Sequence, residues 1–113
     1  EMRLNLEILD SSGYQINKFR AVGGGAKSLK WIQLKANILG RDIDMLTIKE
    51  TGCYGASILA YSAYLGKVAK KISDEWVRPT KTIEPVKKHE IKYKNRFNSY
   101  KKLYKSLKAS RVS

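Results

Sequence analysis

Apolar residues recur every three or four positions in four stretches of the chain, which is the spacing of one face of an α-helix. These stretches span residues 2–12, 28–39, 68–77 and 89–108. In the second stretch Trp31, Leu34 and Ile38 form the stripe, and Ile32 and Leu39 flank it. The pattern therefore predicts amphipathic helices in all four stretches, of which the C-terminal helix is the longest.

Two further stretches, residues 15–22 and 42–48, are predicted to be strands, although the apolar residues of the first do not alternate cleanly. The resulting order is helix, strand, helix, strand, helix, with a long amphipathic helix at the C-terminus. Helices that alternate with strands are typical of an α/β fold. Because two strands are too few for a free-standing sheet, either the remainder of a longer protein supplies more strands or copies of this chain pair as a homo-oligomer.

Residues 50–66 form a stretch of a different kind, because Glu50 carries its only charge and many of its residues are small. A helix that is apolar on every side is usually buried, so this segment is predicted to pack against a sheet or another helix. Alternatively, Gly52 and Gly55 open a helix that faces a ligand. Cys53, the single cysteine of the chain, is assigned to packing because it lacks a partner base.

Two prolines mark an extended linker at residues 78–88, since proline disfavours the helical conformation in the residue before it. The helix that follows, 89–108, carries a steady apolar stripe: Tyr93, Phe97, Tyr100, Tyr104 and Leu107. Such a stripe is usually a docking face, although aromatic side chains between basic ones can also stack on nucleic-acid bases. The sequence favours docking and keeps base stacking as the alternative.

The formal net charge of the chain is +13, but it is not spread evenly. Residues 1–66 carry a net charge of +2, and residues 67–113 carry a net charge of +11. A strongly basic segment can bind nucleic acid, whereas a run of charges is more often a solvated helix face. The solvated face is preferred because no binding motif accompanies the charge. The alternative function is a basic α/β nucleic-acid-binding module that uses the tyrosine- and lysine-rich C-terminal helix.

The sequence contains no stretch of 18 or more apolar residues, so no transmembrane helix and no membrane partner are expected. The first residues lack the basic and apolar regions of a secretory signal. They begin within a helical pattern, which suggests a segment of a longer protein. A single cysteine fits a reducing compartment, so a cytoplasmic location is expected.

Three consecutive glycines join the predicted strand 15–22 to the predicted helix 28–39. Glycine lacks a Cβ, so the backbone there can adopt positive φ angles and another group can come close. The first N–H groups of a helix have no partner within it, and with the glycine turn they can hold a phosphate. A tight turn without a ligand fits the glycines equally well. The candidate site residues are Gly23, Gly24, Gly25, Ala26, Lys27 and Ser28.

Two common glycine motifs fit this segment poorly. The P-loop requires glycines where this chain has Ala21 and Ala26. The dinucleotide motif matches at Gly23 and Gly25 but meets Ser28 in its third glycine position. Asp44 follows at about the sequence distance expected for a contact with a ribose. A dinucleotide-binding subdomain is therefore a weaker, third hypothesis.

A family resemblance gives a stronger hypothesis. The chain resembles the signature that follows the nucleotide-side strand in sugar kinases of the FGGY family at residues 22–28 and at Trp31, Gln33, Ala36 and Gly40. The likeness continues at residues 50–56, 76–77 and 84–85 and at Tyr93, Tyr100, Leu103, Tyr104, Leu107 and Lys108. Among the subgroups, the xylulose kinases are the most similar. One departure is Asn37, which stands where relatives commonly have aspartate.

The resemblance implies that residues 1–113 are the C-terminal portion of the nucleotide-side domain of such a kinase, with an actin-like (ribonuclease H-like) fold. It implies ATP as the cofactor, with the α-phosphate and ribose close to Gly24 and Gly25. Lys27 and Ser28 would then lie beside the adenosine. Mg²⁺ would be held mainly by ATP and by the absent N-terminal domain, to which the sugar and the catalytic aspartate also belong.

The resemblance therefore predicts the nucleotide-binding part of an ATP-dependent carbohydrate kinase, which transfers the γ-phosphate of ATP to a hydroxyl of xylulose or a related sugar. No catalytic residue and no metal ligand is assigned within the chain. His89, its single histidine, is expected at the surface, and no spacing of cysteine and histidine suggests a metal site. The chain by itself is expected to be inactive.

Overall fold

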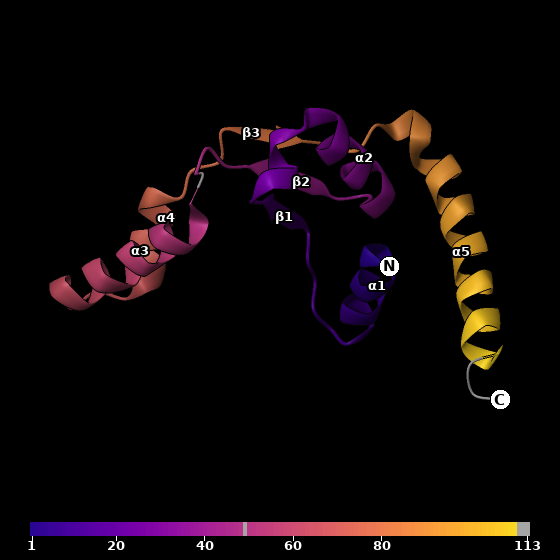
Figure 1. Cartoon of the computed structure of the whole chain (residues 1–113), viewed down its shortest axis with the longest axis horizontal. Coiled ribbons are helices and arrows are strands. Elements are labelled where there is room, and N and C mark those ends of the chain that lie inside the picture. Colours follow the sequence, from indigo (N-terminus) through magenta and orange to yellow (C-terminus); the bar gives the residue numbers. More distant parts are fainter. Residues whose placement is uncertain (49, 111–113) are drawn as a thin grey trace.

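The computed structural model describes residues 1–48 and 50–110 of the chain (Figure 1). None of the helices in these two ranges is both long and apolar enough to cross a bilayer. Two of the elements, labelled η1 and η2, are single turns of 3-10 helix. In chain order the elements are α1 (Met2–Ser11), β1 (Lys18–Ala21), η1 (Gly24–Lys27), α2 (Leu29–Leu39), β2 (Asp42–Met45), α3 (Thr51–Leu65), α4 (Ala69–Trp76), β3 (Lys81–Ile83), η2 (Lys87–His89) and α5 (Glu90–Ser110).

The sheet has three strands in the order β1-β2-β3. Strand β1 pairs in parallel with β2, with Lys18 opposite Asp42, and α2 makes the crossover between them. Strand β3 pairs antiparallel with β2, with Ile83 opposite Ile43. Strand β3 was not predicted from the sequence, and it forms within the predicted linker 78–88. Its three residues are too few to show an alternating pattern, and it is defined by backbone pairing with a distant segment.

Both predicted strands are shorter than expected, because the parallel ladder covers only residues 18–21 and 42–45. Before β1, the carbonyl of Ile16 accepts a hydrogen bond from Arg41 Nε (3.2 Å). At the end of β2, the carbonyl of Met45 accepts hydrogen bonds from the backbone N–H (2.9 Å) and from Oγ1 (3.1 Å) of Thr80, the residue before β3.

The core lies between the sheet and α2, where Ile32 is 1% and Ala36 0% exposed. The buried cluster consists of Leu6, Ile32, Ala36, Leu39, Ile43 and Ile83. Trp31, Leu34 and Ile38 were predicted to form the apolar stripe of α2, which was wrong for Trp31, because its side chain is 50% exposed. The face of α2 that packs on the sheet is rotated by one residue, so that Ile32 and Leu39 are central.

Helices α1 and α5 are both tied to α2. Arg3 of α1 donates a hydrogen bond from Nη1 to the carbonyl of Ile38 (2.9 Å), and its guanidinium lies 4.7 Å from the centre of the Phe97 ring. Phe97 is only 7% exposed, and Lys101 of α5 forms an ion pair with Glu7 of α1 (3.2 Å). The predicted docking face of the C-terminal helix is thus confirmed around Phe97, while its last turns extend beyond α1 (Figure 1).

Helices α3 and α4 form a hairpin that projects from the sheet on the side away from α5 (Figure 1). Trp76 of α4 stacks on Tyr61 of α3, with ring centres 5.2 Å apart. The prediction that this uncharged helix is buried was wrong, because Ile58 and Ser62 are its buried residues and Tyr64 is 84% exposed. Cys53, which was assigned to packing, is also exposed. Among the described residues, α4 provides most of the surface that packs against α3.

Two side chains of α2 hold the segment that leads into α5. Asn37 Oδ1 accepts hydrogen bonds from the backbone N–H of Val86 (2.8 Å) and from Gln33 Nε2 (3.2 Å). Gln33 Nε2 also donates to the carbonyl of Glu84 (2.8 Å). The role of Asn37 here is that of an acceptor, which an aspartate carboxylate at the same position would also fill.

We predict that Asn37→Ala lowers the free energy of unfolding by about 1 kcal/mol, because it leaves a partly buried N–H group without its acceptor. Asn37→Asp retains an acceptor and is expected to lose less. Urea unfolding followed by circular dichroism measures both. Asn98→Ala, at an exposed position of α5, is the control and should be neutral or slightly stabilising. Equal losses in Asn37→Ala and Asn37→Asp would contradict the acceptor role.

Candidate functional site: a glycine-lined crevice

A crevice of about 560 Å³ lies at the carboxyl ends of β1 and β2. Ligands of open α/β sheets bind at this edge of parallel strands, and the volume is within the range of small-molecule sites. The glycine turn, the segment after β2 and the residue before β3 form its walls. The lining residues are Val22, Gly23, Gly24, Ala26, Lys27, Met45, Leu46, Thr47, Ile48, Glu50 and Thr80.

The glycine turn has a backbone shape that depends on Gly23. This residue has φ 81° and ψ −171°, a conformation that is essentially restricted to glycine. Its carbonyl accepts a hydrogen bond from the N–H of Ala26 (3.1 Å), which closes the turn η1. A Cβ built on Gly24 meets no atom within 4 Å, so the backbone at this wall of the crevice is open to a close neighbour.

The turn leads directly into the N-terminus of α2. Ser28 is the N-cap, and its side chain accepts a hydrogen bond from the backbone N–H of Trp31 (3.4 Å). Gly25 lies against the side chain of Trp31, because a Cβ added to Gly25 would be 3.7 Å from Trp31 Cδ1. Of the six predicted site residues, Gly23, Gly24, Ala26 and Lys27 line the crevice, whereas Gly25 and Ser28 are not among its lining residues.

Thr80 completes the opposite wall and was not among the site residues predicted from the sequence. Its N–H and its hydroxyl both donate to the carbonyl of Met45, so the segment between α4 and β3 is fastened to the end of β2. A signal was present in the sequence, because Thr80, Thr82 and Ile83 are β-branched residues of the kind enriched in strands. Among the described lining residues, Glu50 provides a carboxylate and Lys27 a cation.

Asp44 does not serve the crevice, which removes the main support for the dinucleotide hypothesis. Its carboxylate is 4% exposed, accepts a hydrogen bond from Thr82 Oγ1 (2.6 Å) and pairs with Lys18 Nζ (3.6 Å). Both partners lie on neighbouring strands, so the side chain ties the sheet together. Within the described residues, no group of three His, Cys, Asp or Glu side chains is placed to hold a metal ion.

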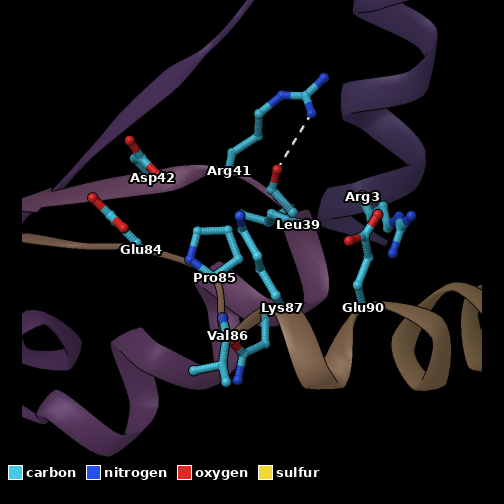
Figure 2. Close-up of a pocket in the computed structure, with 11 residues that line it drawn as sticks. Arg3, Leu39, Arg41, Asp42, Glu84, Pro85, Val86, Lys87 and Glu90 are labelled. Carbon is cyan, nitrogen blue, oxygen red and sulfur yellow. Dashed lines mark hydrogen bonds between the residues drawn. The ribbon is translucent and has the colours of Figure 1, made fainter.

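A second cavity, of about 400 Å³, lies at the other end of the sheet, where β2 begins and β3 ends (Figure 2). Its walls mix charges of both signs: Arg3, Asp42, Glu84, Lys87 and Glu90 contribute, together with Arg41. Arg41 donates from Nη1 to the carbonyl of Gly40 (3.3 Å), the dashed line of Figure 2, and pairs through Nη2 with Asp10 (3.3 Å). The Arg41 guanidinium therefore links α1 to the turn that precedes β2.

The fold and the crevice together define a class of protein. A glycine turn at the carboxyl end of a parallel strand pair, followed at once by a helix N-terminus, is the arrangement by which α/β proteins accommodate phosphate-bearing ligands. The arginines at the other end of the sheet are engaged with backbone carbonyls and with Asp10. The glycine-lined crevice is therefore the better candidate for a ligand site.

Comparison with known proteins identifies the family. The model of the FGGY family of carbohydrate kinases, C-terminal domain, matches residues 1–64. The chain belongs to the FGGY family of carbohydrate kinases. It is 30% identical over 105 residues to the xylulose kinase of Staphylococcus epidermidis, a match that covers 92% of this chain and 21% of that protein. It is 36% identical over 89 residues to the probable L-xylulose kinase of Haemophilus influenzae, covering 79% and 18%.

Solved structures agree with this assignment. A xylulose kinase from Brucella ovis superposes with a TM-score of 0.85 and 30% identity, over 96% of this chain and 22% of that chain. A ligand-bound xylulose kinase from Lactobacillus acidophilus gives a TM-score of 0.79 and 26% identity, over 96% and 23%. FGGY kinases have the actin-like ATPase fold. The chain spans about a fifth of the length of the curated relatives it matches.

These findings do not support the nucleic-acid alternative. The aromatic stripe of α5 would need to face outward to stack on bases, but Phe97 at its centre is buried against α1 and α2. The structural neighbours reported above are sugar kinases. Among the described side chains of α5, the exposed basic ones are Lys92, Lys94, Arg96, Lys102 and Lys105, whereas Lys101 packs over Phe97.

We predict that Gly23→Ala and Gly24→Ala have different effects on stability. At Gly23 the positive φ strains any other residue, so the alanine should lower the free energy of unfolding by about 1–3 kcal/mol. At Gly24 neither the φ angle nor a neighbouring atom opposes a Cβ, so the change should stay within about 0.5 kcal/mol. Thermal and urea unfolding of the two variants measure the difference. A loss in Gly24→Ala as large as that in Gly23→Ala would contradict this description of the turn.

Proposed function

We propose that this chain is the nucleotide-binding part of an ATP-dependent kinase that phosphorylates a hydroxyl group of xylulose or a related ketose. The observation that carries the proposal is the open backbone of Gly23 and Gly24 at the carboxyl end of the parallel strands. Family membership supports the reaction class, and the xylulose kinases among its relatives support the sugar.

The residues of the crevice are suited to a nucleotide. Phosphoryl transfer depends on positioning the phosphates and stabilising their charge. Backbone N–H groups do this best where no side chain blocks them, as at Gly24. Lys27 supplies a positive charge in the lining, and the N-terminus of α2 adds the favourable end of a helix dipole. Ser28 acts indirectly in this scheme, since its hydroxyl caps α2 and thereby fixes where the first helical N–H groups lie.

The remaining parts of the reaction are assigned outside this chain. The base that accepts the proton of the sugar hydroxyl and the contacts that recognise the sugar are expected in the N-terminal domain. Mg²⁺ would be held mainly by the phosphates of ATP and by that domain, and its chemistry is to neutralise charge on the transferring phosphoryl group. The chain by itself is accordingly proposed to be inactive, and a cytoplasmic location fits a kinase that uses ATP.

The proposal is tested in a full-length chimera, in which this chain replaces the matching 105-residue segment of the Staphylococcus epidermidis xylulose kinase. We predict that the chimera phosphorylates xylulose and that Gly24→Val weakens ATP binding at least tenfold, about 1.4 kcal/mol, because the branched side chain fills the space that the phosphates require. Trp31, next to Gly25, offers a fluorescence signal for the titration.

Ser99→Val, on the exposed part of α5, is the matched control and should leave the ATP affinity unchanged. Formation of ADP in the presence of xylulose, measured by a coupled assay, reports the reaction itself. Unchanged ATP affinity in Gly24→Val would contradict the assignment of the crevice. A chimera that binds ATP but forms no ADP with any ketose would contradict the reaction.

A further inference from the structure

Glu50 lines the glycine-lined crevice, and the proposed function assigns no role to its carboxylate. Glu50 is exposed and stands at the N-cap of α3, but its side chain makes no capping hydrogen bond. Its carboxylate also forms no ion pair with the residues that the structure describes. The carboxylate is therefore available to a ligand in the crevice.

The backbone that carries this carboxylate is held in place by α3 and α4. The carbonyl of Glu50 accepts a hydrogen bond from the N–H of Tyr54 (3.0 Å), which closes the first turn of α3. The hydroxyl of Tyr54 donates to the carbonyl of Trp76 (3.1 Å), and the centres of the two rings lie 5.8 Å apart. Glu50 thus projects into the crevice from a helix end that is anchored to α4.

The crevice carries opposite charges on two of its walls. The glycine turn supplies Lys27 and the open backbone of Gly24, whereas the segment after β2 supplies Glu50. Like charges repel more strongly where water is partly excluded, so the phosphates of a nucleotide are disfavoured at Glu50 and favoured at the glycine turn. The part of the nucleotide near Glu50 must then be uncharged and must offer hydrogen-bond donors.

The ribose of a nucleotide meets both requirements, since it is uncharged, adjoins the phosphates and carries hydroxyl groups. An ionised carboxylate only accepts hydrogen bonds, and bonds to it are about twice as strong as those between neutral groups. In dinucleotide-binding α/β proteins an acidic residue holds the ribose 2′-hydroxyl in this way. Asp44 is not available for this role, because Thr82 and Lys18 engage its buried carboxylate.

We propose that Glu50 accepts a hydrogen bond from the ribose 2′-hydroxyl of the bound nucleotide, so that the crevice selects ribonucleotides over 2′-deoxyribonucleotides. The same contact orients the nucleotide, with its phosphates toward Gly24 and Lys27. The inference rests on the proposed function, because it concerns the nucleotide in the same crevice. Its test is a ratio of two nucleotide affinities, which is separate from the question whether a nucleotide binds at the glycine turn.

The test titrates ATP and 2′-deoxy-ATP into the chimera by calorimetry, with EDTA in place of Mg²⁺, so that any effect of Glu50 is independent of the metal. The unaltered chimera should bind ATP about tenfold more tightly than 2′-deoxy-ATP, a difference of about 1.4 kcal/mol. Glu50→Ala should reduce this preference to less than about threefold, because the acceptor is gone. Loss of the carboxylate also relieves repulsion of the phosphates, but that change acts on both nucleotides alike and cancels in the ratio.

Two further variants serve as comparison. Glu50→Gln retains one acceptor oxygen without the charge and should give an intermediate preference. Glu84→Ala removes an exposed carboxylate at the other end of the sheet, so this matched control should leave the preference unchanged. Both Glu50 variants should stay within about 2 °C of the thermal midpoint of the chimera, because the Glu50 side chain does not cap α3.

The outcomes separate this inference from the proposed function. An equal preference for ATP in the chimera and in Glu50→Ala would overturn the role of Glu50, while weaker ATP binding in Gly24→Val would still support the nucleotide site. The competing donor is the amino group of adenine, which inosine triphosphate lacks. If Glu50→Ala abolished a preference for ATP over inosine triphosphate and left the ribose preference intact, Glu50 would be assigned to the base and the proposal overturned. A chimera that binds no ATP would overturn both proposals.

Discussion

The structure depends on the packing of α2 against the three-stranded sheet. Ile32 and Ala36 are almost completely enclosed there, and the other attachments use the same helix. Helix α1 reaches it through Arg3, and the segment before α5 through Asn37. Burial of an aliphatic side chain the size of isoleucine contributes about 1.5–3 kcal/mol. Because Ser28 joins the glycine turn to α2, the same packing fixes the position at which the turn enters the helix.

The sequence was sufficient to predict the α/β class, the helices and the position of the glycine turn, since these follow from spacing within short segments. It failed where the answer depended on distant residues. The shift of the buried face of α2 from Trp31 to Ile32 results from the direction in which the sheet approaches. Residues 81–83 form the strand β3 because their backbone pairs with the edge of β2 that faces away from β1. Thr80 reaches the crevice because β3 runs antiparallel to β2. The β-branched residues there indicate a strand, but they do not specify the strand with which it pairs.

The uncharged helix α3 shows a different limit of sequence-based inference. Its composition is typical of a buried helix, but composition does not say which part of a protein provides the covering surface. Within the described residues that surface is α4, which covers one side of α3.

The residues of the predicted site also separate into two groups in the structure. Gly23, Gly24, Ala26 and Lys27 line the crevice together, while Gly25 and Ser28 act through the shape of the turn and the cap of α2.

The two ends of the sheet have separate roles. Side chains at the amino end, such as Arg41, hold the elements together, whereas the carboxyl end presents open backbone at Gly24. Four residues of strand, about 13 Å, lie between these ends. Substitutions at that separation without shared partners usually have additive effects. Substitutions of Arg41 should therefore leave the backbone at Gly24 unchanged, whereas Gly23 both holds the shape of the turn and lines the crevice, so stability and the shape of the crevice are linked at that one position.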